Sequence, residues 1–195
     1  MSNFSQSTTI SRSRPVRVDQ AFAVINQMVA DDVIKCYALG GATAAFFYIE
    51  PDTTYDVDIF CVLETFQANA IDMLTPVYAY LATKGFEPKA EAVVIHGVAV
   101  QFLPVFNPLN EEAVETAREL DYEGVPVRVM SPEHLVAIML QTGRTKDLVR
   151  IARFAESDAI DRDTLSDILA RHKLKQRWNA LANNLEDIKR RLAKK

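Results

Sequence analysis

The chain has few of the residues that would tie it to a zinc ion, to disulfide bonds or to a membrane. Among 195 residues there are only two cysteines, three histidines and one tryptophan. Cys36 and Cys61 both lie in apolar, strand-like segments, so we expect reduced core residues in a cytoplasmic protein. Cysteine and histidine are not spaced like zinc ligands, and we therefore do not expect a zinc site.

Long apolar runs are also missing. No run approaches the roughly 20 residues of a membrane span, so no contact with a membrane is expected. Residues 1–17 are rich in Ser and Thr, contain three arginines and lack an apolar stretch, which argues against a secretory signal. We expect residues 1–16 to form a disordered arm. The remaining chain, 49% apolar overall, is sufficient for one cored domain, with or without a small appendage.

The charge is unevenly distributed. The net charge of −4 combines a basic end, with nine Lys or Arg and two acidic residues in 171–195, and an acidic middle, with ten Lys or Arg and 24 acidic residues in 18–170. A basic tail is able to contact nucleic acid. A solvated amphipathic helix explains the same charges equally well.

Hydrophobic periodicity divides the chain into a mixed first part and a helical second part. The pattern predicts helices over 19–34, with Asp19 as N-cap, and over 42–49, 67–84 and 110–118. It predicts strands over 36–39 and 57–63, and hairpins over 91–103 and 120–129 around His96-Gly97 and Glu123-Gly124. Beyond the capping pair Ser131-Pro132, it predicts helices over 133–142, 145–156, 161–170 and 173–193. We predict an α/β domain at 17–130 and a helical C-terminal subdomain at 131–195 packed on it.

Residues 40–58 are the most informative segment. Gly40 and Gly41 precede a short apolar helix, and Asp56 and Asp58 alternate at the start of a strand. Side chains at i and i+2 of a strand point to the same face, so the two carboxylates are expected side by side. Two carboxylates repel each other unless a cation lies between them. A hard divalent cation that carries the phosphates of a nucleotide is the natural occupant.

Two segments, Y-A-L-G-G-A-T-A-A (37–45) and T-T-Y-D-V-D-I-F (53–60), resemble the signature of the nucleotidyltransferase superfamily, which includes DNA polymerase beta and the CCA-adding enzymes. The stretch from V-R-V-M-S-P to R-T-K-D-L (127–148) resembles its AbiEii-type branch of minimal nucleotidyltransferases. The resemblance covers roughly residues 36–156. It implies an α/β (α+β) fold in which helices flank a mixed sheet.

The resemblance also implies roles at the glycine turn and the aspartates. Gly40 and Gly41 would let the backbone approach phosphates, with amides of the following helix as donors, and Thr43 would add a hydroxyl donor. Asp56 and Asp58 would bind Mg²⁺ or Mn²⁺ that bridges the triphosphate of an NTP.

Further roles fall on the later segment. Lys146 would contact a phosphate as a point charge. Asp147 would cap or pair locally, or assist near the active site. An ordinary charged helix face, including Arg144, explains these residues without any function.

One departure from the superfamily pattern concerns the third acid, which usually lies on a neighbouring strand. In V-A-V-Q-F-L-P its position falls on Gln101, whose amide oxygen can coordinate Mg²⁺ but brings no negative charge. Three outcomes stay open. Catalysis proceeds with one firmly held metal, or Glu91, Glu50 or Asp52 substitutes, or the site binds a nucleotide and does little chemistry.

The expected activity is the transfer of a nucleoside monophosphate from an NTP to a hydroxyl, on an RNA 3′ end such as that of tRNA or on a protein side chain. The AbiEii-type resemblance implies a toxin–antitoxin or phage-defence setting with a cognate antitoxin. Two alternatives remain. One is an NTP-binding protein without turnover, and the other is a partner-binding module with a vestigial pocket.

Overall fold

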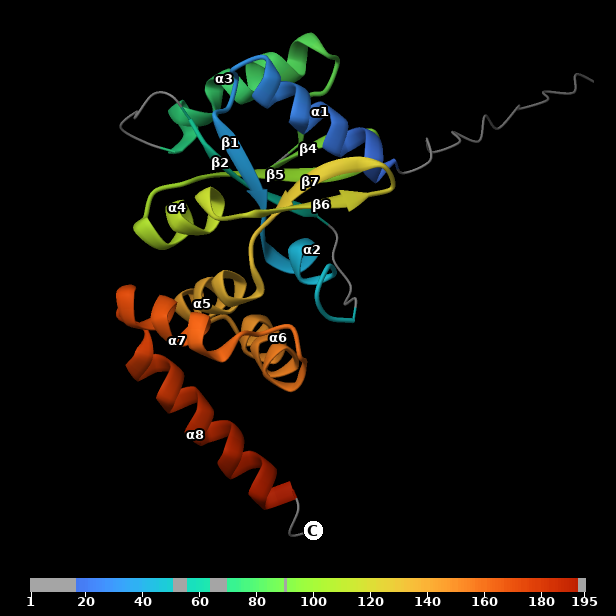
Figure 1. Cartoon of the computed structure of the whole chain (residues 1–195). Helices are drawn as coiled ribbons and strands as arrows, with labels where there is room; N and C mark the ends of the chain where they lie inside the picture. The colour runs from blue at the N-terminus through green and yellow to red at the C-terminus, as the bar shows by residue number, and fades with distance from the viewer. Residues whose placement is uncertain (1–16, 51–55, 64–69, 90, 193–195) are drawn as a thin grey trace, which may run out of the picture.

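A mixed β-sheet forms the centre of the molecule (Figure 1). The computed structural model describes residues 17–50, 56–63, 70–89 and 91–192. Within them, seven strands follow the order β3-β4-β5-β2-β1-β7-β6. The strands are β1 Cys36–Leu39, β2 Val57–Val62, β3 Pro88–Lys89, β4 Ala92–Ile95, β5 Val98–Pro104, β6 Arg118–Tyr122 and β7 Val125–Val129. The helices are α1 Val18–Ala30, α2 Gly41–Ala45, α3 Ala70–Thr83, α4 Pro108–Glu115, α5 Pro132–Thr142, α6 Thr145–Glu156, α7 Arg162–Arg171 and α8 Lys175–Leu192.

The pairing of the strands confirms the predicted mixed sheet. The central strand β2 runs antiparallel to β1 and parallel to β5, and β1 runs parallel to β7. Hairpins join β4 to β5 and β6 to β7. At both hairpins the two turn residues have positive φ, at His96-Gly97 and at Glu123-Gly124. Such turns match the right-handed twist of paired strands, which is why these dipeptides were recognisable.

Helices cover the sheet on both faces. In Figure 1, α1 and α3 lie on one side of it, and α2, α4 and α5 lie on the other. Burial alternates along β2, where Val57, Ile59 and Cys61 are buried while Asp58 and Phe60 are half-buried. Since neighbouring side chains of a strand point to opposite faces, Asp58 lies on the face that α2 and α5 cover.

From Pro132 onward, the described residues contain helices and no strand. The predicted start of α5 is confirmed, because the Ser131 Oγ accepts a hydrogen bond from the amide of His134 and Pro132 occupies the first turn. In Figure 1, α5 to α7 lie beneath the sheet and α8 projects away from them. The division into two domains stays a prediction, and residues 1–16 lie outside the described residues.

Several predicted boundaries were wrong. Helix α1 begins at Val18, and Asp19 is not its N-cap but pairs with Arg17 (Nε to Oδ1 3.1 Å). It ends at Ala30 rather than at residue 34, because the chain leaves the helical region at Asp32, where φ is +55°. Helix α2 covers only 41–45 of the predicted 42–49.

The boundaries of α4 also differ from the prediction. The helix begins at Pro108 rather than at residue 110, and proline suits the first turn of a helix because its missing amide needs no partner there. The true N-cap is Asn107, whose side chain accepts from the amide of Asn110 at 2.9 Å. The helix ends earlier than predicted, and Arg118 already belongs to strand β6.

Cys36 and Cys61 are free thiols, as predicted, and burial raises the pKa of the Cys61 thiol to about 12. A location in the cytoplasm stays a prediction. None of the helices in the described part of the chain combines the length and apolarity that crossing a bilayer requires.

Candidate active site

Asp58 and Gln101 lie side by side on parallel strands. In the register of β2 and β5, Asp58 is the partner of Gln101. Both side chains line a cavity of about 190 Å³ on the face of the sheet that α2 and α5 cover. The amide that stands in place of a third acid therefore lies next to the second aspartate of the D-x-D pair.

The glycine turn lies directly against Asp58. The amide of Gly40 donates to the Asp58 carbonyl oxygen at 3.0 Å. Gly41 has a φ of +57°, and a Cβ atom at this position would lie 1.8 Å from Asp58 Oδ2. Only glycine therefore allows both this backbone conformation and this close approach.

Asp56 is exposed just before β2, and Thr43 ties its backbone in place. The Thr43 hydroxyl, which is buried, donates to the Asp56 carbonyl oxygen at 3.0 Å. In this structure the hydroxyl hydrogen of Thr43 is thus engaged within the protein. The bond joins α2 to the start of the strand that carries Asp58.

The two aspartates interact electrostatically. Burial raises the pKa of the Asp58 carboxyl, and the charge of Asp56 raises this pKa further. The positive charges of Arg144, Lys146 and Arg150 act in the opposite direction. Asp58 is thus a half-buried acid that faces a second acid on one side and the cations of α6 on the other.

The start of α6 forms the opposite wall of the cavity. Asp147 is only 1% exposed, and its Oδ2 accepts from Arg144 Nε at 2.8 Å. Both residues line the same cavity as Asp58. Lys146, which the sequence singled out, is exposed and is not among the lining residues.

Most of the other lining side chains are apolar, and Thr142 of α5 also lines the cavity. The apolar ones come from the sheet, from α5 and from the segment that joins them, and they are Phe60, Leu103, Met130, Leu135, Ile138 and Met139. The sequence did not reveal this apolar lining, because the same spacing of apolar residues describes any helix that packs on a sheet. It also left Arg144 as an ordinary surface charge, since no local pattern shows which cavity a side chain reaches.

Of the residues predicted to hold a metal ion, Asp58 and Gln101 line the cavity, whereas Asp56 is exposed and is not among its lining residues. Within the described residues, no group of three or more His, Cys, Asp or Glu side chains is arranged to hold a metal ion. Glu50 and Glu91 are exposed and do not line the cavity. Asp52 lies outside the described residues. The donor set thus suits a hard cation that also takes ligands from a polyphosphate.

A larger hollow of about 650 Å³ lies in the helical part, where Trp178 of α8 faces α6 and α7. None of its lining residues within the described chain is acidic. It therefore offers no carboxylate for metal chemistry, and the smaller cavity is the candidate active site.

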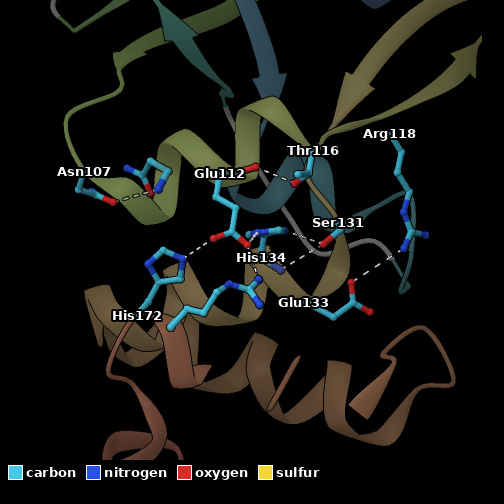
Figure 2. Close-up of polar contacts among 10 residues, drawn as sticks. Asn107, Glu112, Thr116, Arg118, Ser131, Glu133, His134 and His172 are labelled. Carbon is cyan, nitrogen blue, oxygen red and sulfur yellow. Dashed lines mark hydrogen bonds and ion pairs between the residues drawn. The ribbon is translucent and has the colours of Figure 1, made fainter. Parts of the chain in front are cut away.

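A second polar cluster joins α4 to the helical part (Figure 2). Glu112 accepts from His172 Nε2 at 2.7 Å, from His134 Nε2 at 3.2 Å and from Arg171. These bonds, led by that of Arg171, lower the pKa of Glu112 to about 2. Burial lowers the pKa of His134, whose Nδ1 lies 3.0 Å from the Ser131 hydroxyl.

His134 and His172 each lie near the end of a helix, and both meet a carboxylate on α4. The separations of 22 and 60 residues left no local signal for this cluster.

A mixed sheet with two alternating aspartates against a glycine turn defines the chain as nucleotidyltransferase-like in fold. The family model described as "Nucleotidyl transferase of unknown function (DUF2204)" matches residues 18–194. The chain belongs to this family, which confirms the superfamily that the sequence resembled. The AbiEii-type branch stays a prediction.

Two solved structures are similar to this chain. An antigenic nucleotidyltransferase-like protein from Paracoccidioides brasiliensis is similar at 17% identity over 86% of this chain and 94% of its own, with a TM-score of 0.50. ANT(2″)-Ia in complex with adenylyl-2″-tobramycin gives 14% identity over 81% of this chain and 98% of its own, with a TM-score of 0.49. The comparison with curated proteins gave no match.

Proposed function

We propose that this protein transfers a nucleoside monophosphate from an NTP to a hydroxyl acceptor in a reaction that depends on Mg²⁺ or Mn²⁺. The observation that carries this proposal is the contact between Asp58 and the Gly41 turn, in a cavity that also contains Gln101 and Arg144. Membership of a nucleotidyl transferase family supports the same reaction class.

Residues in and around the cavity suit the individual parts of this reaction. Asp56 and Asp58 would hold the metal ion, which would supply positive charge to the transferred and leaving phosphate oxygens. Gly40 and Gly41 allow the backbone to approach the phosphates, and Lys146 contributes positive charge from α6. The acceptor oxygen forms a bond to the α-phosphorus and its hydroxyl proton passes to solvent, while the bond between the α-phosphorus and the oxygen that bridges it to the β-phosphorus breaks, and pyrophosphate leaves.

Gln101 favours one alternative. Its amide brings no charge to the position beside Asp58, so a second metal ion would be weakly held. A protein that binds NTP with little turnover is therefore the second candidate function. Activity gained by Gln101→Asp, together with NTP binding but no transfer in the natural chain, would favour this alternative.

We also propose an AbiEii-like setting, with an RNA 3′ end such as that of tRNA, or a protein side chain, as acceptor. The basic composition of residues 171–195 supports an RNA acceptor. A cognate antitoxin is the expected protein partner in this setting.

The test is incorporation of label. The full chain is incubated with each labelled NTP, Mg²⁺ or Mn²⁺, total tRNA and a protein extract, and labelled macromolecule is measured. We expect Asp58→Asn to reduce incorporation by about 100-fold or more, because several kcal/mol of charge stabilisation depend on the metal. Asp167→Asn, an exposed aspartate on α7, is the matched control and should retain activity. Equal incorporation by wild type and Asp58→Asn would contradict the proposal.

A further inference from the structure

Asp147 is a buried carboxylate that holds an exposed guanidinium. Its side chain is 1% exposed, whereas that of Arg144 is 58% exposed. The Arg144 Nε donates to Oδ2 at 2.8 Å, and a second nitrogen of the guanidinium donates to Oδ1 at 3.4 Å. The two hydrogen bonds to the carboxylate thus fix the orientation of the guanidinium plane.

The remaining donors of Arg144 are available at the cavity. A guanidinium is a planar fork with five N–H donors, and Asp147 occupies only part of them. A fork that is already oriented loses less conformational freedom when it binds an oxyanion. Since Arg144 lines the same cavity as Asp58, the oxyanion it suits would lie beside the proposed metal position.

Arg150 adds a second, independent observation. It is 8% exposed, and its Nε is buried without a hydrogen-bond partner in the described chain. Its NH1 lies 3.8 Å from Asp147 Oδ1, so one buried acid stands between two arginines. The positive charges of Arg144, Lys146 and Arg150 all lower the pKa of Asp58, against the larger effects of burial and of Asp56.

The size of the cavity limits what it encloses. Its volume of about 190 Å³ is small compared with the roughly 300–1,000 Å³ of pockets that enclose a drug-sized ligand. A phosphate chain fits such a space better than a whole nucleotide, so the nucleoside would lie outside it.

We propose that the start of α6 is the subsite for the β- and γ-phosphates of the NTP, with Arg144 as the direct contact and Asp147 as its positioning residue. The proposal rests on the proposed function and adds the location of the leaving group. In the reaction, the bond between the α-phosphorus and the bridging oxygen breaks, and its electron pair stays on the pyrophosphate beside Arg144.

Binding of inorganic tripolyphosphate tests the subsite without any transfer. Calorimetric titration with Mg²⁺ present compares the wild type with Arg144→Gln and with the matched control Arg153→Gln, an exposed arginine of the same helix that does not line the cavity. We expect Arg144→Gln to weaken binding by about tenfold or more, the effect of a lost charge-assisted hydrogen bond. Arg153→Gln should change it by less than about twofold.

Asp147→Asn tests positioning. Removal of a negative charge would by itself tighten the binding of an anion. If Asp147 orients Arg144, the variant should instead weaken tripolyphosphate binding about threefold or more, and only while Arg144 is present. Tighter or unchanged binding by Asp147→Asn would overturn the positioning role, and a thermal melt confirms that each variant folds.

The outcomes separate this subsite from the proposed function. Equal affinity of wild type and Arg144→Gln, in a protein that transfers label, overturns the subsite and leaves the activity standing. Loss of tripolyphosphate binding in Arg144→Gln, in a protein that transfers nothing, supports the subsite and overturns the activity.

Discussion

The pKa values of the Asp58 and Glu112 carboxyls are shifted in opposite directions, although basic side chains act on both of them. Glu112 is hydrogen-bonded to Arg171, His172 and His134, and its pKa falls to about 2. The pKa of Asp58 is raised, because burial and the neighbouring Asp56 outweigh the cations of α6.

The difference lies in whether positive groups bond directly to the acid. At Glu112 the hydrogen-bond donors come from α5 and from the C-terminal end of α7 and bond directly to the carboxylate. This acid therefore attaches the helical part to α4 (Figure 2). At Asp58 the cations act through space, and Arg144 is instead bonded to Asp147. A carboxylate that is hydrogen-bonded to cationic side chains stabilises the fold, whereas one without such bonds suits the binding of a cation.

We expect the largest effect from Gly41→Ala, which changes the Asp58 site without altering any charge. The added methyl would lie 1.8 Å from Asp58 Oδ2, so the carboxylate must move. We expect about 100-fold less nucleotide transfer, because a misplaced metal ligand loses its charge stabilisation. The measurement is the incorporation of label per folded molecule.

Gly85→Ala is the matched control for this substitution. Gly85 also has a positive φ, of +79°, but a Cβ there meets nothing within 4 Å. Both variants should lose about 1 kcal/mol of stability from the backbone strain. Comparable loss of transfer in the two would show that strain, and not the displacement of Asp58, causes the effect.

Glu112→Gln should have the opposite profile to Gly41→Ala. It should lower the stability of the fold and leave nucleotide transfer per folded molecule nearly unchanged. We expect the free energy of unfolding to fall by about 2 kcal/mol, allowing for the partial screening of the ion pairs by solvent. Glu115→Gln, an exposed residue of the same helix, should change it by less than about 0.5 kcal/mol. Denaturant titration checks both values. A large loss of nucleotide transfer per folded molecule in Glu112→Gln would contradict a purely structural role and would place Glu112 in the active site.

This contribution of Glu112 should depend on pH in a defined window. Its pKa is lowered in the folded chain from 4.5 to about 2, so its stabilisation is present above pH 4.5 and is lost as the pH falls toward about 2. The pKa of His134 is also lowered, by burial, so this side chain becomes protonated in the unfolded chain before it does in the folded one, and stability falls as the pH drops below 6.5. The stability difference between wild type and Glu112→Gln should therefore shrink from pH 4.5 downward.

The smallest expected effect is a gain. Gln101→Glu places a third carboxylate beside Asp58, and the affinity for Mg²⁺ in the presence of NTP should rise about tenfold, because ligand charge tunes the affinity of oxygen sites. The measured quantity is the Mg²⁺ concentration that gives half-maximal NTP binding. Gln27→Glu on α1 serves as the control, and an equal gain there would mean that Gln101 is not a metal position.

The fold was largely predictable from local patterns. Turn residues located both hairpins, an apolar run located the central strand β2, and Ser131-Pro132 located the start of α5. Boundaries failed where local signals were ambiguous. Pro108 serves both as a chain breaker and as a first-turn residue, and the spacing of apolar residues did not show that α1 ends at Ala30.

The site was predictable only where residues close in the sequence meet. Gly41 and Asp58 belong to one motif, so their contact could be expected. The packing of α6 and α7 on α5 brings Arg144 to the same cavity as Asp58 and brings His172 to Glu112. Such contacts follow from the tertiary arrangement of whole helices, which periodicity within each helix does not determine.

The cavity takes Asp58 from β2 and the Arg144–Asp147 pair from the start of α6, so neither part of the chain contains the complete site. A truncated protein that stops after β7 would keep Asp58 and lose Arg144. A small inhibitor wedged between the sheet and α6 would separate the two walls, and would not need to imitate a nucleotide to do so.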